Sequence, residues 1–186
     1  MITSILCAAE IRALCDGPKP MLTPFQETYR RHGISGGLDY NGYCISLGDE
    51  WVENNALRID TACIKAANTH KKSLRSKHYT LAPGASVLAV SRERFAMPPN
   101  VLALSFGKST LARINVVTHV TPIEAGWSGH LTIEIHNANK STEVVLREGL
   151  PITQLVFFWV MPSQYDGIYQ HQPAVPVSAW GNGASQ

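Results

Sequence analysis

From Thr80 onward, hydrophobic residues recur in short runs with the spacing of β-strands. Apolar runs at 87–90, 101–106, 144–146 and 152–160 are separated by Pro, Gly and Asn. Runs of this length, bounded by turn residues at a spacing of roughly 8–12 residues, are typical of an all-β domain. The pattern therefore predicts a strand over each of these four ranges.

One segment of this part alternates strictly between apolar and polar residues. Leu131, Ile133 and Ile135 are separated from one another by single polar or charged residues. Because successive side chains of a strand point to opposite faces, the segment predicts a strand with one face in the core. The opposite face would carry His130, Thr132, Glu134 and His136.

The first third of the chain predicts one helix and several short strands. Residues 3–15 are rich in Ala and Leu, with Thr3 or Ser4 as a candidate N-cap, and Asp16-Gly17-Pro18 would end the helix. The segment 33–50 contains many turn residues, which indicates short strands joined by tight bends.

Composition narrows the class of protein. Of the 186 residues, 45% are hydrophobic and 16% are charged, against roughly 25% charged in a typical soluble domain. This balance excludes a disordered chain, and the length suits one domain with a full core. A formal net charge of +2 gives no general reason to expect a nucleic acid or a membrane surface as partner.

The sequence also predicts a cytoplasmic location. It contains no run of about 18 apolar residues that could span a bilayer. Its first residues lack the basic region of a signal peptide. The cysteines show neither CxxC spacing nor a paired framework, and we expect them to be reduced packing residues: Cys7, Cys15, Cys44 and Cys63.

A basic segment without acidic residues extends from Thr61 to Arg92. Two interpretations of it stay open. It is either a solvated loop or an electropositive rim that faces a polyanionic ligand. Its cations cluster toward the middle: Lys65, Lys71, Lys72, Arg75 and Lys77.

The tetrapeptide Gly107-Lys108-Ser109-Thr110 resembles the end of a phosphate-binding loop. A Walker A motif requires a glycine five positions before Gly107, where this chain has Leu102, so that interpretation fails. A glycine, a lysine, two hydroxyls and Arg113 within seven residues are still suited to phosphate. The alternative is an ordinary junction between a strand and a turn.

Metal-based chemistry is disfavoured. His130 and His136 share a strand face, but at about 3.3 Å per residue they lie roughly 20 Å apart and cannot share an ion. The zinc-deaminase signature, His-x-Glu followed by Pro-Cys-x-x-Cys, is absent. Glu134 between them is either a solvent-facing strand residue or a functional carboxylate.

Taken together, three segments resemble the dCTP deaminase family of the dUTPase-like superfamily. They are VLALSFGKSTLAR (101–113), HVTPIEAGWSGHLTIEIHN (119–137) and GLPITQLVFF (149–158), and weaker similarity extends to 34–43 and 167–172. The resemblance implies an all-β, distorted β-barrel or jelly-roll-like domain over 1–186. A helix and linker would occupy 1–20 and a closing tail 161–186. It also implies a homotrimer with sites between subunits.

The resemblance implies zinc-independent hydrolytic deamination of dCTP to dUTP and ammonia, which feeds dUMP and dTTP synthesis. Magnesium would bind through the triphosphate and not through protein side chains, and dTTP is a candidate inhibitor. Two alternatives remain: a dUTP pyrophosphatase or bifunctional enzyme, and a non-catalytic nucleotide-binding regulator. The pyrophosphatases usually have an aliphatic residue in place of Glu134 and Tyr in place of Trp127, so Glu134 favours the deaminase.

By resemblance Glu134 is the catalytic base, and Ser109 helps to orient the water. A carboxylate that takes the water's proton and returns it works best when partly desolvated. The backbone of Thr132 and Ile133 would contact the pyrimidine edge. The phosphate-binding segment would comprise Lys108, Ser109, Thr110, Leu111, Ala112 and Arg113. The deoxyribose would lie against Glu124, Trp127 and Leu131, and the site would be completed by Gln154, Tyr165 and Gln172.

The chain departs from the family pattern at three places. The segment from Tyr165 to Gln172 is shorter than usual, and Ile168 stands where a lysine normally reaches the phosphates. Cys44 replaces the aspartate of the N-terminal region. These changes concern tail closure and triphosphate affinity and leave Glu134 untouched.

Overall fold

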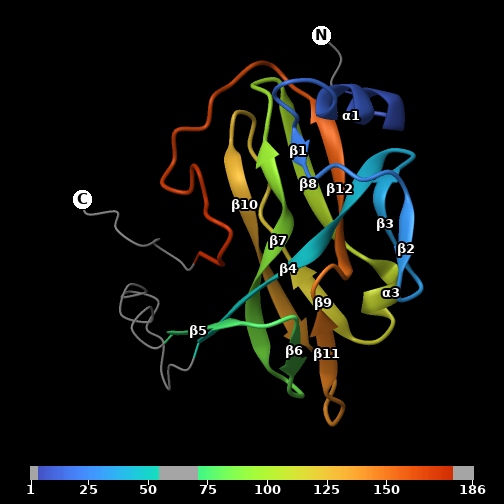
Figure 1. The fold of residues 1–186 in the computed structure, drawn as a ribbon, viewed down its shortest axis with the longest axis vertical. Helices are drawn as coiled ribbons and strands as arrows, with labels where there is room; N and C mark the ends of the chain where they lie inside the picture. The colour runs from blue at the N-terminus through green and yellow to red at the C-terminus, as the bar shows by residue number, and fades with distance from the viewer. Residues whose placement is uncertain (1–3, 55–70, 178–186) are drawn as a thin grey trace.

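The computed structural model describes residues 4–54 and 71–177 and shows a mostly β fold, as expected (Figure 1). Within these ranges the helices are α1 (Ala8–Cys15) and α3 (Ser109–Ala112). Neither range contains a helix long and apolar enough to cross a membrane. The strands are β1 (Leu22–Thr23), β2 (Tyr29–Arg31), β3 (Ile34–Asp39), β4 (Gly42–Asn54), β5 (Lys71–Arg75), β6 (His78–Leu81), β7 (Ser86–Ala96), β8 (Val101–Gly107), β9 (Val116–His119), β10 (Ser128–Asn137), β11 (Val144–Arg147) and β12 (Pro151–Trp159).

Ten of the described strands form one curled sheet, and β6 pairs with β11 in a second small sheet. Strand β4, with 13 residues, joins the two halves of the curl because its first residues, 42–46, lie between β3 and β12, whereas its later residues, 47–54, lie between β5 and β7. The order β4-β7-β10-β9 places β10 between two antiparallel neighbours. All of these pairings are antiparallel, and the sheet curls into a half-barrel.

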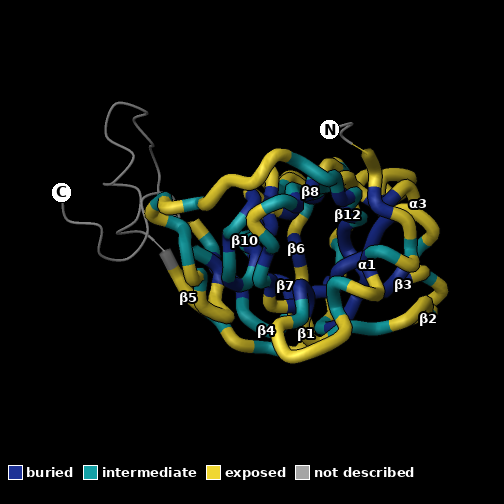
Figure 2. Tube along the Cα trace, turned by 90° about the horizontal axis from the view of Figure 1, so that it is seen from above, coloured by how far each residue is buried: buried dark blue, intermediate teal, exposed yellow. Residues whose placement is uncertain are grey.

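The buried stretches of the strands lie toward the inside of the molecule, where their side chains form the core (Figure 2). Its largest fully buried side chains are those of Trp51, Tyr43, Phe95 and Phe157, contributed by β4, β7 and β12. Residues of one face of each strand supply the remainder, as the alternating burial of β7 and β10 shows.

The strands predicted from Thr80 onward are confirmed by β7, β8, β11 and β12. The alternation along β10 is confirmed as well: Leu131, Ile133 and Ile135 are buried, while Glu134 on the opposite face is exposed. The turn-rich segment 33–50 forms the β3–β4 hairpin, although β4 continues to Asn54 and is longer than the bends suggested.

The predicted helix over 3–15 begins too early. Among its described residues the helix starts at Ala8, and Cys7 rather than Thr3 or Ser4 is its N-cap. Leu6 donates its backbone N–H to Phe157 O at 2.9 Å, and Ile5 pairs with Phe158. These residues are extended because they bind the free edge of β12, a contact that local helix propensity does not reveal.

The basic segment is not a loop throughout. Residues 71–75 form β5, which pairs with β4. Arg75 donates its Nε–H to Asp49 Oδ2 at 2.8 Å, so its charge is partly compensated. Residues 55–70, with Lys65 and Cys63, lie outside the described residues.

Asn137 fixes the end of β10. It is fully buried, and its Nδ2 donates to three carbonyl oxygens, those of Leu81, Ala82 and Thr142, at 3.0, 3.1 and 2.8 Å. Its Oδ1 accepts the backbone N–H of Asn139 at 3.1 Å. The amide therefore ties β10 to β6 and to the segment before β11.

We predict that Asn137→Ala lowers the free energy of unfolding by about 3 kcal/mol, because several buried carbonyls lose their partner at roughly 1–3 kcal/mol each. Urea denaturation compared with the exposed neighbour variant Lys140→Ala measures this loss. Equal stability of the two variants would show that the amide network is dispensable.

Candidate functional site

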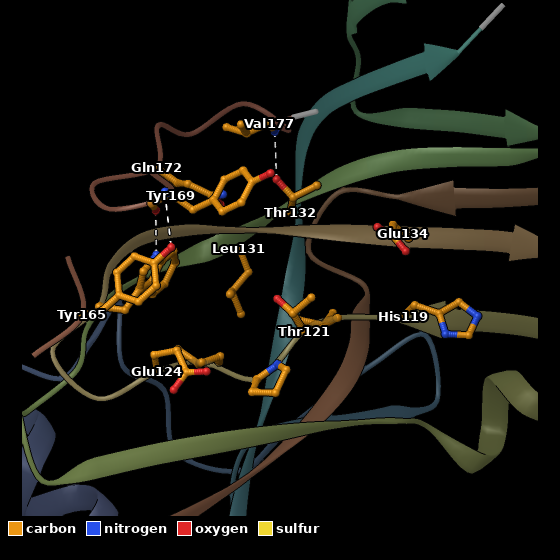
Figure 3. Close-up of a pocket in the computed structure, with 14 residues that line it drawn as sticks. His119, Thr121, Glu124, Leu131, Thr132, Glu134, Tyr165, Tyr169, Gln172 and Val177 are labelled. Atoms are coloured by element: carbon orange, nitrogen blue, oxygen red, sulfur yellow. Dashed lines mark hydrogen bonds between the residues drawn. The ribbon is translucent and has the colours of Figure 1, made fainter. Parts of the chain in front are cut away.

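A cavity of about 430 Å³ lies at β10 and is lined from both faces of that strand (Figure 3). Strand β10 supplies Leu131, Thr132 and Glu134 to its lining. The segment 119–124 that follows β9 forms a second wall, with Trp127 beside it. The lining combines apolar surface with two carboxylates, those of Glu124 and Glu134.

Glu134 reaches the cavity because of the strand register. Its Cα pairs with Leu88 on β7 and with His119 on β9. The flanking residues Ile133 and Ile135 are buried, so the carboxylate is directed to the opposite face. In the single chain this side chain is exposed, as are His119 and Glu124.

Trp127 and Leu131 form the apolar part of the lining. Both are buried, and the Trp127 ring packs against Phe95 with ring centroids 6.1 Å apart. The indole Nε1–H of Trp127 donates to the backbone oxygen of Tyr169 at 2.7 Å. The indole is therefore held between the core and the C-terminal segment.

Of the expected closing tail, 161–186, residues 165–177 fold back onto β10 and the turn before it, and the name closing tail is used below for this part (Figure 1). His130 donates its N–H to Gln172 O at 3.0 Å, and His171 donates to Ser128 O at 2.8 Å. Val177 donates its N–H to Thr132 Oγ1 at 2.8 Å, a contact drawn in Figure 3. The closing tail thus contributes to the lining of the cavity, through Tyr165, Tyr169, Gln172 and Val177.

Gly129 is needed for this close approach. Its φ is +138°, and a Cβ added there would overlap the backbone of Gln172. Any larger residue would therefore push the tail away from β10. The packing of the tail against Gly129 therefore explains why this position is a glycine.

A second group of expected site residues lies away from the cavity. Thr153 pairs with Gly107, which places Gln154 near the start of α3. Gln154 also pairs in register with Cys44 on β4. On α3 and its ends, Lys108 and Leu111 are buried, whereas the remaining expected phosphate contacts are exposed: Ser109, Thr110, Ala112 and Arg113.

Lys108 differs from its neighbours because it is only 8% exposed. Its Nζ donates to Cys44 Sγ at 3.0 Å. Burial raises the pKa of the Cys44 thiol, and the nearby ammonium offsets this only in part. The lysine ammonium is therefore in contact with a neutral thiol.

The structure brings seven of the expected site residues together at the cavity and leaves eight elsewhere. Those at the cavity are Glu124, Trp127, Leu131, Thr132, Glu134, Tyr165 and Gln172. Ile133 is buried behind β10, and the remainder belong to the second group: Lys108, Ser109, Thr110, Leu111, Ala112, Arg113 and Gln154. The sequence did not single out several lining residues, namely His119, Thr121, Pro122, Tyr169 and Val177.

A mostly apolar cavity with a few polar groups is typical of small-ligand sites, so the class that the fold and the cavity indicate is a β domain that binds a small ligand. A family model described as dCTP deaminase-like matches residues 5–160. A dCTP deaminase of Nautilia profundicola is 36% identical over 141 residues, 74% of each chain. One of Acidobacterium capsulatum is 32% identical over 169 residues, 84% of this chain and 90% of that protein.

The chain belongs to the dCTP deaminase-like family, which confirms the family predicted from sequence and makes it an enzyme of that family. Among solved structures, a 2'-deoxycytidine 5'-triphosphate deaminase from Agrobacterium tumefaciens has a similar fold. Its TM-score is 0.64 at 23% identity, over 86% of this chain and 49% of that one. The expected fold class is confirmed by this likeness.

We predict that Gly129→Ala detaches the closing tail. Amide hydrogen exchange at His130 and His171 should become faster by about tenfold or more, since local opening governs it. Gly84→Ala is the matched control, because Gly84 also has a positive φ, +71°, but nothing lies within 4 Å of an added Cβ. Unchanged exchange in Gly129→Ala would contradict the close-approach explanation.

Proposed function

We propose that the protein catalyses hydrolytic deamination of dCTP to dUTP and ammonia. The observation that carries this proposal is the carboxylate of Glu134 at the cavity, in a chain of this family. The relatives named above are themselves called dCTP deaminases. The product would supply dUMP and dTTP synthesis.

Glu134 is the group on this lining that suits the proton transfers. Replacement of the C4 amino group requires that water lose a proton, that the ring nitrogen gain one and that departing ammonia carry one away. One carboxylate that accepts the proton of water and returns it to the substrate serves each step. Because Glu134 is exposed in the single chain, partial desolvation would come from the bound nucleotide and a second copy.

The rest of the lining fits a deoxynucleotide. Trp127 and Leu131 offer a flat apolar surface for a sugar without a 2′-hydroxyl, with Glu124 beside them. The backbone of Thr132 and Ile133 is next to Glu134 on β10 and suits the edge of a pyrimidine. Tyr165 and Gln172 would enclose the ligand from the tail.

The triphosphate, as its magnesium complex, would be held by residues of a second copy in a homotrimer. Two observations support this part of the proposal. The segment 108–113 does not line the cavity of its own chain, although Arg113 is exposed and free to reach another. Next to this segment, Phe106 and Ile114 are 53% and 52% exposed, which suits apolar contact between copies.

An assay of two products tests the proposal. The protein is incubated with dCTP and separately with dUTP, and ammonia and pyrophosphate are measured. Ammonia alone from dCTP supports the deaminase, and its persistence with a zinc chelator and excess magnesium supports zinc independence. Pyrophosphate from dUTP would show a pyrophosphatase, both products from dCTP a bifunctional enzyme, and tight binding without either product a regulator.

We predict that Glu134→Gln lowers the rate of ammonia release from dCTP by about 10²-fold or more, while the affinity for the nucleotide is largely kept. The amide keeps the size of the side chain but cannot take up the proton. Glu143→Gln, at an exposed position away from the cavity, is the control. Unchanged turnover in Glu134→Gln would remove this residue from the mechanism.

For Arg113→Ala we predict a KM for dCTP that is about 10- to 150-fold higher, with kcat little changed. One charge-assisted contact to phosphate is worth roughly 1.5–3 kcal/mol, which corresponds to this range. Arg147→Ala, also at an exposed arginine, should leave KM unchanged. If Arg113→Ala bound dCTP as well as wild type does, the phosphate assignment would be wrong.

A further inference from the structure

The closing tail forms a large part of the cavity. Four lining residues belong to it: Tyr165, Tyr169, Gln172 and Val177. Figure 3 shows Tyr165, Tyr169 and Gln172 gathered on the side of the cavity away from His119. The shape of the site therefore depends on whatever fixes the tail to the body of the protein.

One side chain of the tail, that of Gln170, binds the turn before β10 through both ends of its amide. Its Oε1 accepts the backbone N–H of Ser128 at 2.6 Å. Its Nε2 donates to the backbone oxygen of Gly126 at 2.9 Å and to that of Tyr165 at 3.2 Å. The amide thus bridges an N–H and a C=O on either side of Trp127, as a paired strand would, and also ties the tail to itself.

Gln170 does not line the cavity, so it acts through its neighbours. The residue before it, Tyr169, lines the cavity and accepts the indole N–H of Trp127. Two residues after it, Gln172 accepts the N–H of His130. The side chain is half-buried under this segment, which keeps its hydrogen bonds out of bulk water.

We propose that Gln170 is a positioning residue for the deamination reaction: its amide locks the closing tail onto the turn 126–128 and so sets Tyr165, Tyr169 and Gln172 at the nucleotide. Its kinetic consequence rests on the proposed function. Since Gln170 does not touch Glu134, its loss should weaken nucleotide binding far more than the chemical step.

Three variants test this role. Gln170→Met keeps the length of the side chain and removes both hydrogen-bonding ends. Gln170→Glu keeps an acceptor for Ser128 but sets a carboxylate against two carbonyl oxygens. Gln164→Met is the matched control, because Gln164 Nε2 donates to the same oxygens of Gly126 and Tyr165, at 3.0 and 3.3 Å, but its side chain is exposed and makes no contact with Ser128 in the described structure.

For Gln170→Met we expect amide exchange at Ser128, His130 and His171 to be about tenfold faster, with exchange in the middle of β10 unchanged. The KM for dCTP should rise about tenfold and kcat should change less than about twofold. Gln170→Glu should be at least as impaired, and Gln164→Met should behave like wild type in both measurements.

Wild-type exchange in Gln170→Met would overturn the proposal. So would faster exchange with unaltered kcat and KM, or an equal effect of Gln164→Met. If the wild-type protein releases no ammonia from dCTP, the proposed function fails. The exchange comparison alone then decides whether Gln170 holds the tail.

Discussion

The two faces of β10 are the constraint on which the site depends. Leu131, Ile133 and Ile135 are buried in the core, and this leaves Thr132 and Glu134 on the opposite face. A shift of one residue in the pairing with β7 would exchange the two sets and bury the carboxylate. The free energy of the core therefore fixes the place of Glu134, and the cavity needs no separate device to orient it.

The turn before β10 joins this strand to the tail. Gly129, the second residue of β10, admits the backbone of Gln172, and the peptide groups at 126 and 128 bind Gln170. Trp127 packs on Phe95 and binds Tyr169, so core, turn and tail are coupled through one indole. The closing tail has little secondary structure of its own, and its position is set by these contacts with the turn and the start of β10.

Strand β10 and the family could be predicted because their signals lie in short, continuous segments of the sequence. Alternation identified β10, and the segments around Lys108 and Glu134 identified the family. The helix start was wrong because Leu6 pairs with the distant Phe157. Strand β5 was missed because its sequence, KKSLR, is mostly charged and contains no apolar run. The contact of Lys108 with Cys44 and the hydrogen bond between Gln170 and Ser128 could not be predicted, because each depends on residues that only the fold brings together.

The central claim is that the cavity of one copy and the phosphate-binding segment of another form one nucleotide site. Mixing two variants tests it most directly. Glu134→Gln and Arg113→Ala proteins are unfolded together and refolded, at a dCTP concentration that gives neither alone significant turnover. If sites are shared, random trimers should regain roughly a quarter of the wild-type sites. Ammonia release no higher than the sum of the separate variants would contradict the account.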